Sequence, residues 1–233
     1  MDRTSDYSIV NSRLLVPYFA PYMAYVSIAF LGKNLPYEWN YLLRATIVLT
    51  LLLWGRKRYI TFRGPKSPTF SALYGLIYGV LGTLVWIGLM APFVGESGET
   101  WYGAAFTARL LTATLIVPVF EELSMRGYIF RLALQWDKNR LEGVPDALSY
   151  TMHSCSINDV RPGEWTFFAA MVSILFFTVG HAFHEWPAAI AYGALMTHLL
   201  IFRKDLLSCI VAHGTTNMLL GLYVQNTGQW IYW

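Results

Sequence analysis

The sequence is poor in charged residues and in cysteine. Asp, Glu, Lys and Arg make up 13% of its 233 residues, and 55% are hydrophobic. That charged share is about half of the share in an ordinary soluble domain. The two cysteines, Cys155 and Cys209, fit neither a disulfide framework nor a CxxC metal-binding pattern. The chain also lacks internal repeats, low-complexity tracts and any nucleic-acid signature, so nucleic acid is not an expected partner.

What the chain does have is a series of apolar runs. They cover residues 14–31, 37–54, 70–94, 103–134, 165–183, 187–202 and 206–224. A helix that crosses a bilayer needs about 20 predominantly apolar residues, and several of these runs approach or exceed that length. The sequence therefore predicts an all-α polytopic membrane protein with about seven transmembrane helices. Residues 1–233 would form a single integral membrane domain, with its core in the fourth to seventh spans.

The first run has a rival interpretation as a signal peptide. It is long for the apolar part of such a peptide, and a short polar head that contains Arg3 and Arg13 precedes it. The residues that close it, from Phe30 to Lys33, contain no small-x-small cleavage site. We therefore expect the run to be a retained span.

Basic residues predict the orientation of the spans. Loops rich in Lys and Arg face the cytoplasm, and the strongest basic cluster lies between residues 55 and 66. Counting from this loop places the N-terminus inside and the C-terminus outside. The acidic 95–102 loop, with Glu96 and Glu99, is then outside. Residues 135–164 show no clear period, carry Gly and Pro at both ends, and are predicted to form an ordered or mobile cytoplasmic loop.

Two adjacent carboxylates, Glu121 and Glu122, lie deep inside the run 103–134. A charge near the bilayer centre costs about 3 kcal/mol or more, so such residues are usually paired or face a wet cavity. Glu122 precedes Arg126 by four residues, the order that favours an ion pair on a helix. Glu121 has no such local cation, and burial would make its carboxylate a stronger base. Pro118 predicts a loosened turn just before it.

Histidine and asparagine occur in two later runs. His181 lies late in the fifth run and His213 in the seventh. Asn217 follows His213 by four residues, so both project from one helical face. At about 1.5 Å per residue, Glu121 and His213 come out near the midplane of the membrane. By the same count His181 lies about 24 Å from the start of its span. This places it beyond the midplane, unless that span starts later or tilts.

These residues form three motifs in a fixed order on separate predicted spans. They are Glu121-Glu122-x-x-x-Arg126, Phe177-x-x-x-His181 and His213-x-x-x-Asn217. The set resembles the motifs of the CAAX-protease and Abi (CPBP) family of intramembrane glutamic endopeptidases, and the resemblance covers about residues 103–221. The segment GHAFHEWPAA is also similar to a family branch found beside exosortase systems in bacteria. Residues 135–164 depart from the family pattern by lengthening the interval between the first two motifs.

The resemblance implies a catalytic core at 103–221. In it Glu121 and His181 activate a water molecule, and His213 and Asn217 stabilise the oxyanion. Physical chemistry agrees with these roles, because hydrogen-bond donors aimed at a developing negative charge gain strength where water is scarce. Glu122 is expected in the same catalytic group. Arg126 and Phe177 would hold the residues of that group in position.

The implied activity is hydrolysis of a peptide bond in a peptide or protein tail that is presented at the membrane. No metal or other cofactor is expected. The partners implied are the substrate, the lipid bilayer and proteins of an exosortase system. The expected location is the bacterial inner membrane.

The sequence was also compared with the motifs of other protease chemistries. The HExxH zinc motif is missing, because Ala188 stands where a second histidine would follow His184 and Glu185. A GxSxG elbow and a GxGD motif are missing too. A zinc site on His181 and His184, three residues apart, remains an alternative.

Three alternatives in function also stay open. The two glutamates could have a structural role alone and bridge helices, for instance through Arg109 or Arg44. The chain could be a non-catalytic immunity or scaffold protein that binds a peptide or a partner protease. It could also carry protons or a solute along Glu121, His181 and His213, although the sequence lacks the repeated halves typical of transporters.

Overall fold

The computed structural model describes residues 9–93 and 99–233, so Arg3 and Glu96 lie outside the described residues. Within these two ranges the structure contains helices and helical turns and no strand, which confirms the all-α prediction. The elements are α1 (Asn11–Leu31), α2 (Tyr37–Gly55), α3 (Pro68–Met90), η1 (Ala91–Phe93), α4 (Gly103–Leu115), α5 (Val117–Glu122), η2 (Leu123–Ile129), α6 (Phe130–Leu141), α7 (Ala147–Ser154), η3 (Ile157–Asp159), α8 (Phe167–Val179), η4 (Phe183–Glu185), α9 (Trp186–Arg203), α10 (Leu206–Thr227) and η5 (Trp230–Tyr232).

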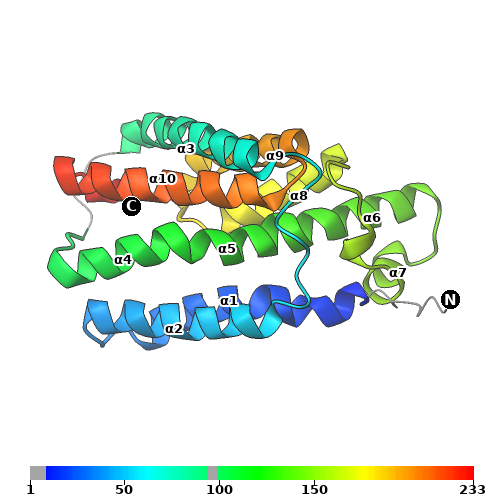
Figure 1. Cartoon of the computed structure of the whole chain (residues 1–233), viewed down its shortest axis with the longest axis horizontal. Helices are drawn as coiled ribbons and strands as arrows, with labels where there is room; N and C mark the ends of the chain where they lie inside the picture. Colours follow the sequence, from blue (N-terminus) through cyan, green and yellow to red (C-terminus); the bar gives the residue numbers. More distant parts are fainter. Residues whose placement is uncertain (1–8, 94–98) are drawn as a thin grey trace.

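The long helices lie roughly parallel to one axis and run back and forth along it (Figure 1). Helices α1 and α2 pair on one side, α4 to α6 follow one another as a rod through the middle, and α3, α8, α9 and α10 lie on the other side. The N-terminal end of α1 and the C-terminal end of α10 are at opposite ends of the bundle. This arrangement surrounds the middle rod with helices on both sides.

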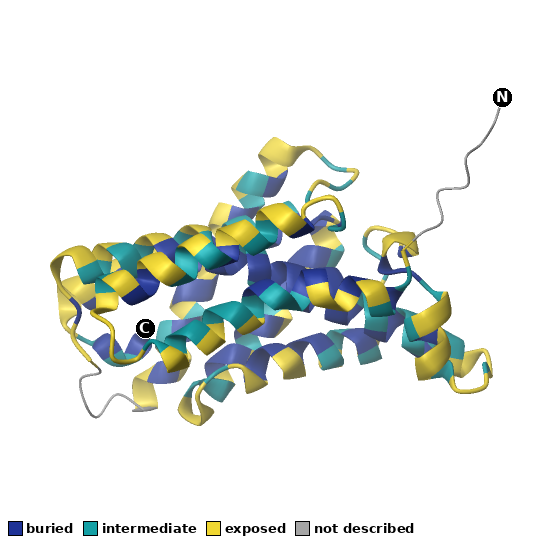
Figure 2. Ribbon diagram, turned by 90° about the horizontal axis from the view of Figure 1, so that it is seen from below, coloured by how far each residue is buried: buried dark blue, intermediate teal, exposed yellow. Residues whose placement is uncertain are grey.

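The outward helix faces are exposed and the inward faces are buried (Figure 2). Many of the exposed side chains are large and apolar, such as Phe30, Leu53 and Leu84. A soluble monomer rarely exposes so much contiguous apolar surface. The surface is therefore suited to contact with lipid.

Four helical stretches are long and apolar enough to cross a membrane. They are Asn11–Leu31, Pro68–Met90, Gly103–Leu141 and Leu206–Thr227. The fifth predicted span is shorter than expected, because α8 covers only Phe167–Val179. Together these stretches identify the chain as an integral membrane protein.

The middle rod is interrupted just before the two glutamates. Helix α4 ends at Leu115, and Pro118 is at the second position of α5. The loosened turn predicted at Pro118 is therefore present, for the expected reason that proline cannot donate a hydrogen bond to the turn before it. After Glu122 the backbone continues as the π-helix η2. Such stretches are rare and are often found at functional sites.

Glycine allows α10 to approach its neighbours closely. A β-carbon added at Gly75 on α3 would lie 2.7 Å from the β-carbon of Val211 on α10. One added at Gly214 on α10 would lie 2.6 Å from the backbone oxygen of Thr114 on α4. Small residues serve this purpose in membrane helix pairs. They bring the helix that carries His213 against the helices around it.

Residues 135–164 form an ordered segment that contains helices. Helix α6 extends to Leu141, and α7 adds a second helix before the turn η3. The buried side chain of Asn11 ties this segment to the start of α1: its Nδ2 donates to the backbone oxygen of Thr151 at 2.8 Å, and its Oδ1 accepts from the backbone nitrogen of Ile157 at 2.6 Å. These bonds join residues more than a hundred positions apart, so local sequence patterns carried no sign of them.

Candidate active site

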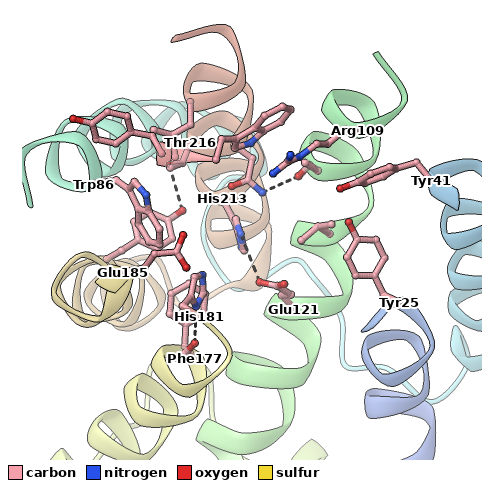
Figure 3. Close-up of a pocket in the computed structure, with 17 residues that line it drawn as sticks. Tyr25, Tyr41, Trp86, Arg109, Glu121, Phe177, His181, Glu185, His213 and Thr216 are labelled. Carbon is pink, nitrogen blue, oxygen red and sulfur yellow. Dashed lines mark hydrogen bonds and ion pairs between the residues drawn. The ribbon is translucent and has the colours of Figure 1, made fainter. Parts of the chain in front are cut away.

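A cavity of about 210 Å³ lies within the bundle, and it brings three of the sequence motifs together. Glu121 from α5, His181 from the turn after α8, and His213 and Asn217 from α10 all line it (Figure 3). The other lining residues are Tyr25, Tyr41, Trp86, Arg109, Ala113, Val117, Phe177, Glu185, Tyr192, Thr216, Leu220, Tyr232 and Trp233. The four predicted polar residues therefore share one space.

His213 lies between the two glutamates. Its Nδ1 is 2.9 Å from Oε1 of Glu122, and its Nε2 is 3.8 Å from Oε2 of Glu121. A carboxylate only accepts hydrogen bonds, so Nδ1 carries a proton and donates it to Glu122. The separation on the Nε2 side exceeds a direct hydrogen bond. His213 thus presents its second nitrogen to Glu121 across a short gap.

Glu122 is fully buried behind the cavity and does not line it. Nη1 of Arg126, also fully buried, lies 3.2 Å from Oε1 of Glu122. This confirms the ion pair expected from the spacing of the two residues. The Arg126 guanidinium also lies 4.9 Å from the ring centroid of Phe177. Arg126 therefore holds Glu122, the residue that orients His213, and Phe177 packs against Arg126.

Glu121 faces the cavity and keeps about a fifth of its side chain exposed (19%). Neither arginine named as a bridging partner pairs with it among the described residues. Nε of Arg44 donates to Oδ1 of Asn40, and the guanidinium of Arg109 lies against two indole rings. Of the charged partners considered from the sequence, only Arg126 pairs with the glutamates, and it pairs with Glu122. Glu121 is consequently the carboxylate of the pair that faces the cavity.

His181 does not lie on a helix, in contrast to its expected place within the fifth span. Helix α8 ends at Val179, and His181 follows in the turn before η4. Its Nδ1 lies 2.9 Å from the backbone oxygen of Phe177. A carbonyl oxygen only accepts, so Nδ1 carries the proton, and Nε2 of the neutral ring is an acceptor. This turn brings His181 to the cavity, although a count of residues along the predicted fifth span placed it beyond the midplane.

Asn217 lines the cavity one turn beyond His213 on α10. Its Nδ2 donates to the backbone oxygen of Ala113 on α4 at 2.8 Å. An amide nitrogen has two hydrogens. One therefore fixes the side chain against α4, and the other is available to a ligand.

Trp86 belongs to this site, although no local pattern in the sequence pointed to it. It lies on α3 in an apolar run, and its ring centroid is 5.4 Å from that of His181. Its Nε1 is buried without a hydrogen-bond partner among the residues described. Only the three-dimensional packing of α3 against α9 and α10 could reveal this donor.

The zinc alternative finds little support in the donor set. His184 is exposed at the end of the bundle, away from the buried Glu122. Within residues 9–93 and 99–233, no group of three or more His, Cys, Asp and Glu side chains is arranged to hold a metal ion. Glu122 is already engaged by Arg126 and His213.

The comparison with protein families adds independent evidence. The family model described as "Type II CAAX prenyl endopeptidase Rce1-like" matches residues 103–219, which is half of the chain. The chain belongs to the Rce1-like CAAX endopeptidase family. The match includes each residue that the sequence motifs singled out, from Glu121 to Asn217. No curated protein and no solved structure matches the chain.

The Rce1-like family is a family of endopeptidases, and the matched range contains the carboxylate pair Glu121 and Glu122. The helices α1 to α3 lie outside the matched range. They nevertheless contribute Tyr25, Tyr41 and Trp86 to the cavity wall.

Proposed function

We propose that this Rce1-like protein is a glutamic-type intramembrane endopeptidase that cleaves a peptide or protein tail presented at the membrane. Four polar side chains from three distant parts of the sequence, Glu121, His181, His213 and Asn217, line one cavity. Their convergence is the observation that carries the proposal. A set that only held the helices together would have no reason to leave Glu121 facing an open space.

In the proposed reaction Glu121 is the general base. Its carboxylate takes a proton from a water molecule, and Nε2 of His181 accepts the second water hydrogen and so orients the oxygen. The water oxygen attacks the carbonyl carbon of the peptide bond. Glu121 then gives the proton to the amide nitrogen, the C–N bond breaks, and a carboxylic acid and an amine leave.

The negative charge that develops on the carbonyl oxygen needs hydrogen-bond donors. The second N–H of Asn217 supplies one. His213 supplies another when its Nε2 carries a proton, while its Nδ1 stays bonded to Glu122. Such fixed donors are worth most in a site with little water. Glu122 and Arg126 act by holding His213 in place.

No metal is required for these steps. The proposed water activation uses a carboxylate and a neutral imidazole, and the second carboxylate is held by Arg126 and His213. We therefore assign the chain to metal-independent proteolysis.

We also propose the arrangement of the chain in the membrane. Residues 1–233 would form one membrane domain with seven spans, because the long helices alternate in direction along one axis (Figure 1). The loop between α2 and α3, which carries the basic residues of 55–66, and the turn between α9 and α10, which follows Arg203, lie on the side of the bundle toward α6 and α7 (Figure 1). That side, with residues 135–164, would face the cytoplasm of a bacterial inner membrane. The catalytic core would be 103–221, and exosortase-system proteins are candidate partners.

A substrate search tests this function. Membranes from cells that express the wild-type protein or Glu121→Gln would be compared for newly formed peptide termini by mass spectrometry. We expect termini that appear with the wild type and disappear with Glu121→Gln, while Glu142→Gln, at an exposed acid directly after α6, keeps them. Identical termini in wild type and Glu121→Gln would overturn the proposal.

A further inference from the structure

Arg109 occupies a position on the cavity wall that the catalytic steps do not use. It lies on α4, twelve residues before Glu121 on the same rod, and its side chain reaches toward α10 (Figure 3). It also lines a second hollow of about 360 Å³, together with Trp101, Trp230 and Trp233. Arg109 therefore stands where the cavity continues toward the end of the bundle that carries the C-terminus.

Two indole rings lie against the Arg109 guanidinium. Its central carbon lies 4.7 Å from the ring centroid of Trp101 and 4.5 Å from that of Trp233. Cation–π contacts of this kind hold the cation in place without using its N–H groups as hydrogen-bond donors to a partner atom. The guanidinium can therefore still bind an anion with two parallel hydrogen bonds.

Arg109 has no hydrogen bond or ion pair with any other described residue. Arg126 differs, because it pairs with Glu122, and Arg44 differs, because it bonds to Asn40. The two acids that share the second hollow with Arg109 have other partners. Glu99 accepts from the hydroxyl of Tyr37, and Glu185 accepts from the backbone nitrogen of Ala182.

We propose that Arg109 binds a carboxylate of the substrate at the end of the cavity away from Glu121. This rests on the proposed peptidase function and adds a substrate class to it: chains that carry a negative charge a fixed distance from the cleaved bond. Arg109 is a specificity-determining residue in this account and takes no part in bond cleavage.

The helix sets the distance. Twelve residues at about 1.5 Å each separate the two positions by about 18 Å along the rod. An extended peptide covers about 3.3 Å per residue. The carboxylate therefore lies about five residues from the cleaved bond. It is either the C-terminal carboxylate of the substrate or an Asp or Glu side chain.

Capture of peptides on an inactive protein tests the assignment. The probe is a pool of randomised nonapeptides with an N-terminal benzophenone, made once with a free C-terminal carboxylate and once with a carboxamide. Both pools would be photocrosslinked to full-length Glu121→Gln in nanodiscs, and the captured peptides counted and sequenced by mass spectrometry. The same measurement would use Glu121→Gln combined with Arg109→Gln, with Arg109→Lys, and with Arg44→Gln as a control that removes another ring-stacked arginine.

We expect about tenfold more capture of the carboxylate pool, the size of a charge-assisted hydrogen-bond pair. If the carboxylate belongs to a side chain, both pools are captured equally but are enriched in Asp or Glu at one position. Either preference should vanish with Arg109→Gln, persist in part with Arg109→Lys, and be unchanged with Arg44→Gln. Thermal unfolding of each variant shows whether it is folded. Absence of both preferences, absence of capture, or a preference that survives Arg109→Gln would overturn the proposal.

The capture experiment separates this proposal from the peptidase proposal. A carboxylate preference lost with Arg109→Gln would support the binding site even if the wild type cleaved none of the captured peptides. Cleavage by the wild type without any carboxylate preference would support the peptidase and overturn the role of Arg109.

Discussion

Nδ1 of His213 lies 2.9 Å from Oε1 of Glu122, and both side chains are buried. This contact fixes the plane of the imidazole, so that Nε2 points at the carboxylate of Glu121, 3.8 Å away. Glu122 is fixed in turn by Arg126 at 3.2 Å. Glu121 therefore lies at the end of a chain of three buried polar groups, His213, Glu122 and Arg126.

Replacement of Glu122 should affect both stability and activity. We expect Glu122→Gln to lower the free energy of unfolding by about 3–5 kcal/mol, because it leaves Arg126 as a buried charge without a partner. Activity should also fall, since His213 loses its orienting carboxylate. Denaturant unfolding in detergent micelles measures the first effect, and initial cleavage rates measure the second.

The combined variant Glu122→Gln with Arg126→Met is the control for the ion pair. Its loss of stability should be less than the sum of the two single losses, because no unpaired charge remains. Strict additivity would show that the two residues do not depend on each other.

Asn217 should contribute mainly to catalysis. We expect Asn217→Ala to lower kcat by about 10²–10³, the usual effect of removing one oxyanion donor, and to cost about 1 kcal/mol of stability through the lost bond to Ala113. Asn226→Ala is a matched control, because Nδ2 of Asn226 makes a comparable 2.8 Å bond on the exposed surface of α10. Steady-state kinetics would contradict this role if both variants kept the wild-type kcat.

Close packing of α10 against α4 should tolerate no extra carbon at Gly214. A β-carbon there would lie 2.6 Å from a backbone oxygen, which cannot move aside easily. We expect Gly214→Ala to destabilise the protein by about 1–3 kcal/mol and to displace the adjacent His213. Gly88→Ala on α3 has open space around it and should be neutral or slightly stabilising. Equal unfolding midpoints for the two variants would disprove this packing argument.

Metal removal should leave the activity unchanged. The proposed base and oxyanion donors are side chains, and Glu122 is occupied by Arg126 and His213. Dialysis against EDTA or 1,10-phenanthroline, followed by the cleavage assay, tests this. Loss of activity that returns on addition of Zn²⁺ would instead favour the zinc alternative.

Local patterns in the sequence predicted the parts of the site that depend on helix geometry. The Glu122–Arg126 ion pair follows from a spacing of four residues, and it is present. The shared face of His213 and Asn217 follows from the same rule, and both line the cavity. The break near Pro118 follows from the chemistry of proline.

Contacts between distant segments could not be predicted in this way. The turn that carries His181 depends on the end of α8 at Val179, which no apolar run marks. The order in residues 135–164 depends on Asn11, far away in the sequence. Trp86 and Arg109 joined the site only because α3 and the start of α4 fold over it. The apolar runs predicted the long helices of the bundle. Tertiary packing determined which side chains come into contact.

The rate of peptide cleavage by purified Glu121→Gln tests the central claim most directly. The substitution keeps the shape of the side chain and removes its ability to take a proton. With a peptide identified from the membrane comparison, we expect the initial rate to fall by about 10³ or more, while the thermal unfolding midpoint stays close to that of the wild type. A folded Glu121→Gln protein that cleaves the peptide at the wild-type rate would contradict the account.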